Sequence, residues 1–170
     1  YQVMRTKASR AGACVVDTLE ELLDVSELFL RCPSPPNRGV AVLGESGSFK
    51  ALTLDFCETI GLDLPALSPV AEAALRDVLP DFIHPTNPMD MTAQGLVDRE
   101  LYRKTLPPLL ADEHCGSIVL GIILTDEWTS DLKLPPIIET LKSLKPAKPV
   151  IFAGLDEGAE IPRTYIDELR

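Results

Sequence analysis

Short apolar runs alternate with segments of helical periodicity along most of the chain. The runs at 39–43, 117–124 and 150–153 are continuously apolar, which is typical of strands buried on both faces. Apolar spacing of three to four residues predicts a helix over 49–60, marked by Leu52, Phe56 and Ile60 and ended by Gly61. Further helices are expected at 69–79, 98–110, about 136–144 and 162–169, the first of them started by Ser68-Pro69 and the second kinked or shortened by Pro107-Pro108.

The first forty residues precede this alternation. Residues 1–9 begin with a short apolar run, and residues 13–16 are a second short apolar run. Each of the two segments predicts one strand. Thr18 and Glu21 have the spacing of a capping box, so a helix is expected over 18–31. The proline-rich segment 33–37 predicts a linker. Beyond the first strand of the main body, 62–64 is a candidate short strand, and 80–97 is expected to be a long loop.

Strands that alternate with helices pair in parallel through right-handed crossovers, with helices on both faces of the sheet. The expected fold is therefore α/β: a flavodoxin-like, three-layer, doubly wound domain with a mainly parallel sheet. Ligands of such sheets bind beyond the carboxyl ends of the strands. Here that edge comprises the loops at 44–48, 86–92 and 124–129.

The turn after the first buried strand carries the clearest chemical signal. Its residues, from Gly44 to Phe49, lead directly from a strand into a helix, where backbone N–H groups and the helix dipole attract an anion. The candidate phosphate-binding residues are Glu45, Ser46, Gly47, Ser48 and Phe49. The structural alternative is that every strand-to-helix turn favours small residues, and the Glu45 carboxylate opposes anion binding unless it points away.

Two better-known turn motifs do not fit these residues. A nucleophile elbow requires glycine at the fifth position, where Ser48 stands. A Walker A loop requires a longer turn that ends in Gly-Lys-Ser or Gly-Lys-Thr. An FMN or receiver domain is also disfavoured, because no aspartate ends the strand and the turn has few hydroxyl groups.

Composition narrows the function classes. The formal net charge of −10 over 170 residues disfavours nucleic-acid binding. No apolar run approaches the roughly 18–20 residues of a membrane helix. The cysteines form no CxxC pair and have no histidine at metal-ligand spacing, so no metal site is expected; we interpret them as reduced, mostly buried thiols of a cytoplasmic protein: Cys14, Cys32, Cys57 and Cys115.

The remaining candidates are weaker. His84 and His114 are expected to be exposed loop histidines rather than catalytic bases. Asp126 and Glu127 could bind a metal at the sheet edge, although paired acids there are usually solvated, and Trp128 either covers the cleft or packs on the next helix. The possible cleft residues are Asn87, Asp90, Thr92 and Asp126.

Several sequence landmarks follow one another over roughly 10–170. In order, they are 16–22, the glycine-bearing turn after 40–43, 58–62, Leu79-Pro80, 87–92, Tyr102, 110–112 and 148–150. The most specific of them is Asn-Pro-x-Asp-x-Thr, at 87–92. Their order and spacing resemble the NDP-forming acyl-CoA synthetases, in particular the flavodoxin-like CoA-ligase domain, which is similar to the carboxyl-terminal domain of the succinyl-CoA synthetase β subunit.

The resemblance implies a function. Acyl-CoA synthetases of this kind interconvert acyl-CoA + NDP + phosphate and acid + CoA + NTP through an acyl phosphate and a phosphohistidine, which the helix start after the turn helps to hold. CoA and ATP or ADP with Mg²⁺ are implied for the whole enzyme, and only phosphate for this domain. The implied partners are CoA-binding and ATP-grasp domains or subunits, with homo- or hetero-oligomers possible and no nucleic acid or membrane.

Two departures from the family pattern affect that interpretation. Ser48 replaces the second glycine of Ser-Gly-Gly, and neither histidine of the chain matches the Ser-His-Thr-Gly-Ala segment that carries the phosphohistidine. Residues 1–9 resemble the end of the preceding domain, with 10–38 as connecting strand, helix and linker, and 39–170 as the CoA-ligase domain. The histidine loop is expected between Ser9 and Arg10, either as a segment missing from the printed sequence or as a deletion.

The chain by itself is therefore expected to be inactive. The alternative function is a non-catalytic regulatory or interaction module of a synthetase-like protein.

Overall fold

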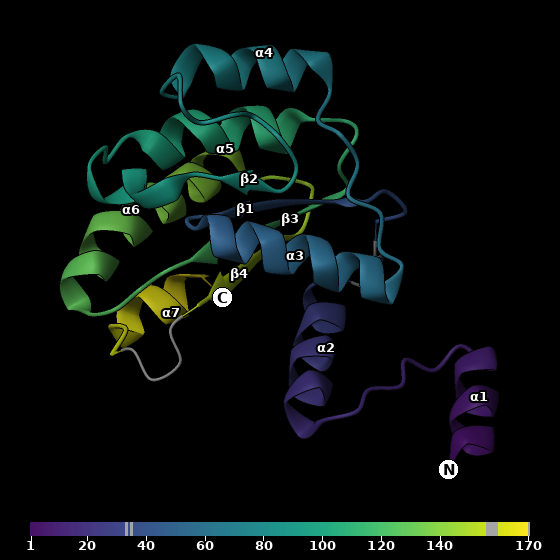
Figure 1. Ribbon diagram of the computed structural model, residues 1–170. Coiled ribbons are helices and arrows are strands. Elements are labelled where there is room, and N and C mark those ends of the chain that lie inside the picture. The colour runs from purple at the N-terminus through teal and green to yellow at the C-terminus, as the bar shows by residue number, and fades with distance from the viewer. Residues whose placement is uncertain (33, 35, 156–159, 170) are drawn as a thin grey trace. The chain divides into compact units, whose positions relative to one another are not determined.

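The computed structural model describes residues 1–170 except 33, 35, 156–159 and 170 (Figure 1). The chain divides into two units, Tyr1–Pro35 and Pro36–Arg170. The predicted linker at 33–37 falls partly on residues 33 and 35, which lie outside the described residues.

The described residues of the first unit form two helices, α1 (Gln2–Arg10) and α2 (Leu19–Arg31), neither of which has a buried residue. The predicted strands at 1–9 and 13–16 are therefore wrong: α1 occupies the first range, and the second has no regular structure. A strand needs a neighbouring strand for its backbone hydrogen bonds, whereas a helix forms its bonds within the segment. The capping box is confirmed, because Glu21 N donates to Thr18 Oγ1 at 3.1 Å and Thr18 N donates to Glu21 Oε2 at 3.3 Å.

The described part of the second unit contains a four-stranded sheet whose strand pairs are all parallel. Its strands are β1 (Val40–Gly44), β2 (Met89–Asp90), β3 (Ser117–Ile122) and β4 (Val150–Gly154), and their order is β2-β1-β3-β4. This confirms the predicted α/β class with its parallel sheet. The central strand β1 is buried along its whole length, as its uniformly apolar sequence predicts.

Helices lie on both sides of the sheet. Figure 1 shows α3 (Gly47–Ile60) on one side and α5 (Leu101–Ala111) and α6 (Glu127–Leu144) on the other, with α4 (Pro69–Val78) beyond α5. A short 3₁₀ helix, η1 (Thr92–Leu96), follows β2, and α7 (Arg163–Leu169) ends the described chain.

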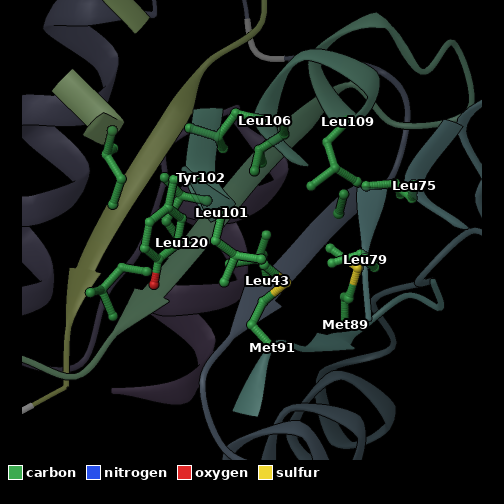
Figure 2. Packing of buried hydrophobic residues seen from close by; sticks show 14 of the residues in the cluster. Leu43, Leu75, Leu79, Met89, Met91, Leu101, Tyr102, Leu106, Leu109 and Leu120 are labelled. Carbon is green, nitrogen blue, oxygen red and sulfur yellow. The ribbon is translucent and has the colours of Figure 1, made fainter. Parts of the chain in front are cut away.

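The core lies between the sheet and α4, α5 and α6. Leu43 and Leu120 project from the strands toward Leu101 and Leu106 of α5, and Leu75 and Leu79 close the far end (Figure 2). The opposite side is covered less completely. The apolar stripe that predicts α3 lies on the exposed face of that helix, since Leu52, Phe56 and Ile60 are 54–66% exposed.

Several expectations for the main body need correction. Residues 62–64 form no strand. The strands on the two sides of β1 are β3 and β2, and β2 is a two-residue element inside the segment 80–97, which proline content predicts as a loop. The helix expected from about residue 136 begins at Glu127, and it passes through Pro135 and Pro136.

Likewise, α5 begins at Leu101 rather than 98 and continues through Pro107 and Pro108 to Ala111. A proline inside a helix costs about 3 kcal/mol. The buried side chains beside these prolines offset that cost, because each contributes about 1.5–3 kcal/mol: Leu106 and Leu109 in α5, and Leu132, Leu134, Ile137 and Ile138 in α6.

Among the described residues, no helix is both long enough and apolar enough to span a bilayer.

Candidate functional site

The turn between β1 and α3 is open to solvent at its tip. Ser46 is the N-cap of α3, with extended backbone angles, but its hydroxyl makes no capping bond. Gly47 and Ser48 are exposed. In the described part of the chain, no protein acceptor meets the N–H groups of Gly47, Ser48 or Phe49. The first turn of α3 therefore presents unused donors at the positive end of a 14-residue helix.

The start of α3 is fixed by an aromatic anchor. Gly44 of β1 and Gly121 of β3 are opposite each other in the parallel register, and the Phe49 ring lies against both. A Cβ atom at Gly121 would lie 2.5 Å from Phe49 Cζ, and one at Gly44 would meet the same ring still closer. Paired glycines on adjacent strands thus form the seat that holds the first turn of the helix.

Glu45 points away from the open tip. Successive strand residues face opposite sides, so Leu43 and Glu45 both face the core whereas Gly44 faces α3. Glu45 Oε2 accepts hydrogen bonds from Lys133 Nζ at 2.8 Å and from Ile123 N at 2.8 Å, and Oε1 accepts one from the Tyr102 hydroxyl. Lys133 Nζ also donates to Ile123 O at 2.6 Å.

This cluster is almost completely buried: the side chains of Lys133 and Glu45 are only 4% and 2% exposed. Burial raises the pKa of Tyr102 well above its usual range, and the Glu45 carboxylate raises it further, so the hydroxyl stays protonated and donates. Gly95 makes room for the cluster, because a Cβ there would lie 2.6 Å from Glu45 Oε1 and 2.9 Å from the Tyr102 hydroxyl.

A second carboxylate lies beside the turn. Asp90, at the end of β2, accepts a hydrogen bond from Thr92 N at 2.8 Å through Oδ1. Its Oδ2 would be 3.4 Å from a Cβ atom at Gly47. Thr92 has a positive φ of 52°, which an L-residue rarely adopts. The structure therefore brings Asp90 and Thr92 to the same edge of the sheet as Gly47.

The other proposed cleft residues have different contacts. Asn87 accepts from Val42 N at 2.9 Å and donates to Val40 O at 2.8 Å and Pro65 O at 2.9 Å, so its side chain extends the hydrogen bonding of β1. Asp126 caps α6 by accepting from Thr129 N at 2.8 Å, and the hydrogen bonds from Thr129 lower the pKa of Asp126.

A cavity of about 580 Å³ adjoins Asp126. It is lined by Thr125, Asp126, Glu127, Glu160, Ile161 and Pro162. Its three carboxylates disfavour a phosphate ligand. Within the described ranges, no group of three or more histidine, cysteine or acidic residues is arranged to hold a metal ion.

The histidines are exposed loop residues, as predicted, and Trp128 is 60% exposed. All four cysteines are free, in agreement with the reduced thiols expected from their spacing. Only Cys57 and Cys115 are buried, so the expectation of mostly buried thiols holds for two of the four.

Sequence reasoning missed three residues of the buried cluster: Lys133, Gly95 and the role of Tyr102. The sequence does contain a sign that Lys133 is buried, because this lysine stands directly between the apolar residues Leu132 and Leu134. A cation in an apolar stretch needs an anionic partner when it is buried.

The class defined by these observations is a parallel α/β domain whose central strand leads into a solvent-open, donor-rich helix start. No family model matches the chain. The chain is 50% identical over 170 residues to trans-feruloyl-CoA synthase FCS1 from an unknown prokaryotic organism, an alignment that covers 100% of this chain and 24% of that protein.

Two further relatives are named as ADP-forming. Acetate–CoA ligase [ADP-forming] II subunit alpha of Pyrococcus furiosus is 27% identical over 154 residues, which cover 89% of this chain and 33% of the relative. The 4-hydroxybutyrate–CoA ligase [ADP-forming] of Nitrosopumilus maritimus is 25% identical over 149 residues, covering 88% of this chain and 21% of the relative. This chain is thus a homologue of one domain-sized segment of a feruloyl-CoA synthase and of ADP-forming CoA ligases, in agreement with the resemblance of its motifs, and it spans only about a fifth to a third of their length.

Solved structures agree in fold. PH0766 from Pyrococcus horikoshii matches with a TM-score of 0.77 and 24% identity over 93% of this chain and 36% of that one. The dinucleotide-forming acetyl-coenzyme A synthetase 1 of Ca. Korarchaeum cryptofilum, in complex with phosphate and ADP, matches with a TM-score of 0.76 and 16% identity over 89% of this chain and 32% of that one.

Proposed function

We propose that this chain is part of an acyl-CoA synthetase that interconverts acyl-CoA + NDP + phosphate and acid + CoA + NTP. The observation that carries the proposal is the 50% identity to trans-feruloyl-CoA synthase over all 170 residues. The two ADP-forming CoA ligases among the relatives support NDP as the nucleotide product of the ligase direction. CoA, ATP or ADP, Mg²⁺ and the CoA-binding and ATP-grasp domains belong to the proposal for the whole enzyme.

Within that enzyme, we propose that this domain binds a phosphoryl group at the start of α3. The donors are the N–H groups of Gly47, Ser48 and Phe49 and the hydroxyls of Ser46 and Ser48, with Glu45 contributing only through its backbone. The open tip of the turn and the inward direction of the Glu45 carboxylate support this assignment. The resemblance to the family gives a phosphohistidine from another segment as the group held there.

The activity is tested on the full-length protein that contains this segment. Ferulate, acetate and 4-hydroxybutyrate are supplied separately with CoA, ATP and Mg²⁺, and the nucleotide products are separated by chromatography. Formation of an acyl-CoA with stoichiometric ADP and phosphate supports the proposal. Formation of AMP and pyrophosphate contradicts the proposed reaction. Formation of no acyl-CoA with any of the acids contradicts it as well and favours the non-catalytic module.

The assignment of this domain is tested by replacing Ser46. Ser46→Asp adds a fixed negative charge at the N-cap, where it stabilises the helix but repels a phosphoryl group. We expect the variant to fold with unchanged or increased stability while its phosphate affinity and its turnover fall at least about tenfold. Ser34→Asp, at an exposed residue of the first unit, is the matched control for the added charge.

A further inference from the structure

A lysine and a glutamate are buried together beneath the β1–α3 turn, although this turn exposes its backbone donors to solvent a few residues away. Every polar atom of the pair has its partners within the described residues: Glu45 is bound by Lys133, Tyr102 and Ile123, and Lys133 is bound by Glu45 and Ile123. Ile123 is the first residue after β3, so the pair also binds both backbone groups where that strand ends.

The surroundings are shaped to hold the carboxylate. Gly95 has no side chain where a Cβ would lie 2.6 Å from Glu45 Oε1, and Tyr102 comes from α5 to donate to the same oxygen. Three separate elements, η1, α5 and α6, therefore meet at one carboxylate. Such convergence favours the inward orientation of the Glu45 side chain. The positive charge of Lys133 offsets the free-energy cost of burying the carboxylate in the core.

The Glu45 carboxylate has a second available position, at the start of α3. It directly precedes Ser46, the N-cap of α3, so rotation of its side chain out of the core brings the carboxylate toward the unused N–H groups of Gly47 and Ser48. A carboxylate at a helix N-terminus is stabilised by the dipole and by those donors. There it would compete with an anionic ligand, beside the carboxylate of Asp90 that already lies near Gly47.

We infer that Lys133 is a positioning residue of the β1–α3 turn: by holding the Glu45 carboxylate in the core, it keeps an internal competitor away from the anion site. The inference rests on the proposed function of that turn. Lys133 touches no ligand in this scheme and acts entirely through Glu45.

The test uses the 170-residue chain with inorganic phosphate as the probe, followed through the amide resonances of Gly47 and Ser48. We expect the variant K133M to bind phosphate about tenfold more weakly than the unsubstituted chain. The double variant K133M/E45Q, which removes the released charge, should return to within about threefold. K142M, in which the same helix loses an exposed lysine paired with Glu168, controls for net charge.

A second measurement on the same samples needs no phosphate. In K133M, the amide resonances of Gly47 and Ser48 should move from their positions in the unsubstituted chain, because the released Glu45 carboxylate then lies close to these N–H groups. Most of this displacement should be absent from K133M/E45Q, which lacks the charge. If K133M does not fold, as judged by circular dichroism, K133Q replaces it, since glutamine retains an N–H donor but not the charge.

The outcomes separate the two proposals. A chain that binds no phosphate contradicts the anion site, and the inference about Lys133 is then decided by the amide resonances of Gly47 and Ser48 alone. A folded K133M or K133Q that binds phosphate normally and shows no displacement of these resonances overturns the inference. Weak binding that E45Q fails to restore also overturns it, because the defect then lies in the fold and not in the charge of Glu45.

Discussion

Lys133 Nζ lies 2.8 Å from Glu45 Oε2, and the two side chains are each less than 5% exposed, which makes this the most deeply buried ion pair in the described part of the chain. The pair joins the end of β1 to α6 across the carboxyl edge of the sheet. Its exposed counterpart on the same helix, Lys142 with Glu168, has a similar distance of 2.6 Å but is open to water on both sides. The two pairs therefore separate the effect of burial from the effect of charge.

Lys133→Met is expected to lower the free energy of unfolding by about 3–5 kcal/mol, because the Glu45 carboxylate loses its buried charge partner and, with it, the hydrogen-bonded inward orientation. Lys142→Met should change it by no more than about 1 kcal/mol. Urea denaturation of the two variants, monitored by circular dichroism, makes the comparison. Equal losses of stability would show that burial of the Glu45 pair carries no special energy.

Gly121→Ala is expected to destabilise the domain by about 1–3 kcal/mol, since its methyl group would occupy the space of the Phe49 ring. Phe49→Ala should also be destabilising, by about 2–4 kcal/mol, through lost packing. In the double variant, the Phe49 ring is absent, so the new methyl group has no steric clash. The combined loss of stability should therefore be smaller than the sum of the two single losses by about 1 kcal/mol. Additive losses in a thermal-unfolding cycle would contradict the aromatic seat described here.

Asn87→Ala should cost about 2–3 kcal/mol, because Val42 N, Val40 O and Pro65 O would all lose their side-chain partner in a part-buried place. Asn37→Ala, at an exposed residue, is the control and should stay within about 0.5 kcal/mol. Guanidinium denaturation provides both values. A neutral effect of Asn87→Ala would mean that water replaces all three bonds.

Cys115 is expected to resist alkylation. Burial raises the pKa of its thiol to about 11, and the nearby Asp112 carboxylate adds to the shift, so very little thiolate is present at pH 8. Cys14 is exposed and should react with iodoacetamide far faster, as peptide mass spectrometry of a timed reaction would show. Equal rates would contradict the burial of Cys115.

The same shift has a consequence for stability. A raised pKa means that the folded chain keeps the proton more tightly than the unfolded chain does. The contribution of Cys115 is therefore complete below pH 9 and is lost as the pH rises toward 11. Cys115→Ser should remove this part of the alkaline decline.

Local sequence patterns predict much of the fold. Thr18 and Glu21 signal a helix start within four residues, and the apolar run of β1 needs no distant information to be recognised as a buried strand. β2 is not predicted because a two-residue strand is too short to show a periodic pattern of apolar residues. Its pairing also depends on Leu43 and Gly44 in another part of the chain. The first half of α6 escapes because Pro135 and Pro136 argue against a helix that only its buried face, formed in the tertiary structure, makes favourable.

In the candidate site too, local features can be predicted from the sequence and features that depend on distant residues cannot. Gly44 to Phe49 are adjacent in sequence, so their turn and its possible anion chemistry can be predicted from the order of the residues. The direction of the Glu45 side chain cannot, because it depends on Lys133, which is distant in the sequence and meets Glu45 only after β1, β3 and α6 have assembled.

The strand order also governs when this domain can form. β1 is central, yet its main partner is β3, and the register joins Val40 to Ser117 across all of α3, α4 and α5. Contacts between residues so far apart in sequence form slowly, because the loop between them must close first. During synthesis, a chain that has not yet reached Ser117 therefore holds its most apolar strand with one edge unpaired, and the Phe49 seat and the buried pair can be completed only after β3 and α6 have left the ribosome.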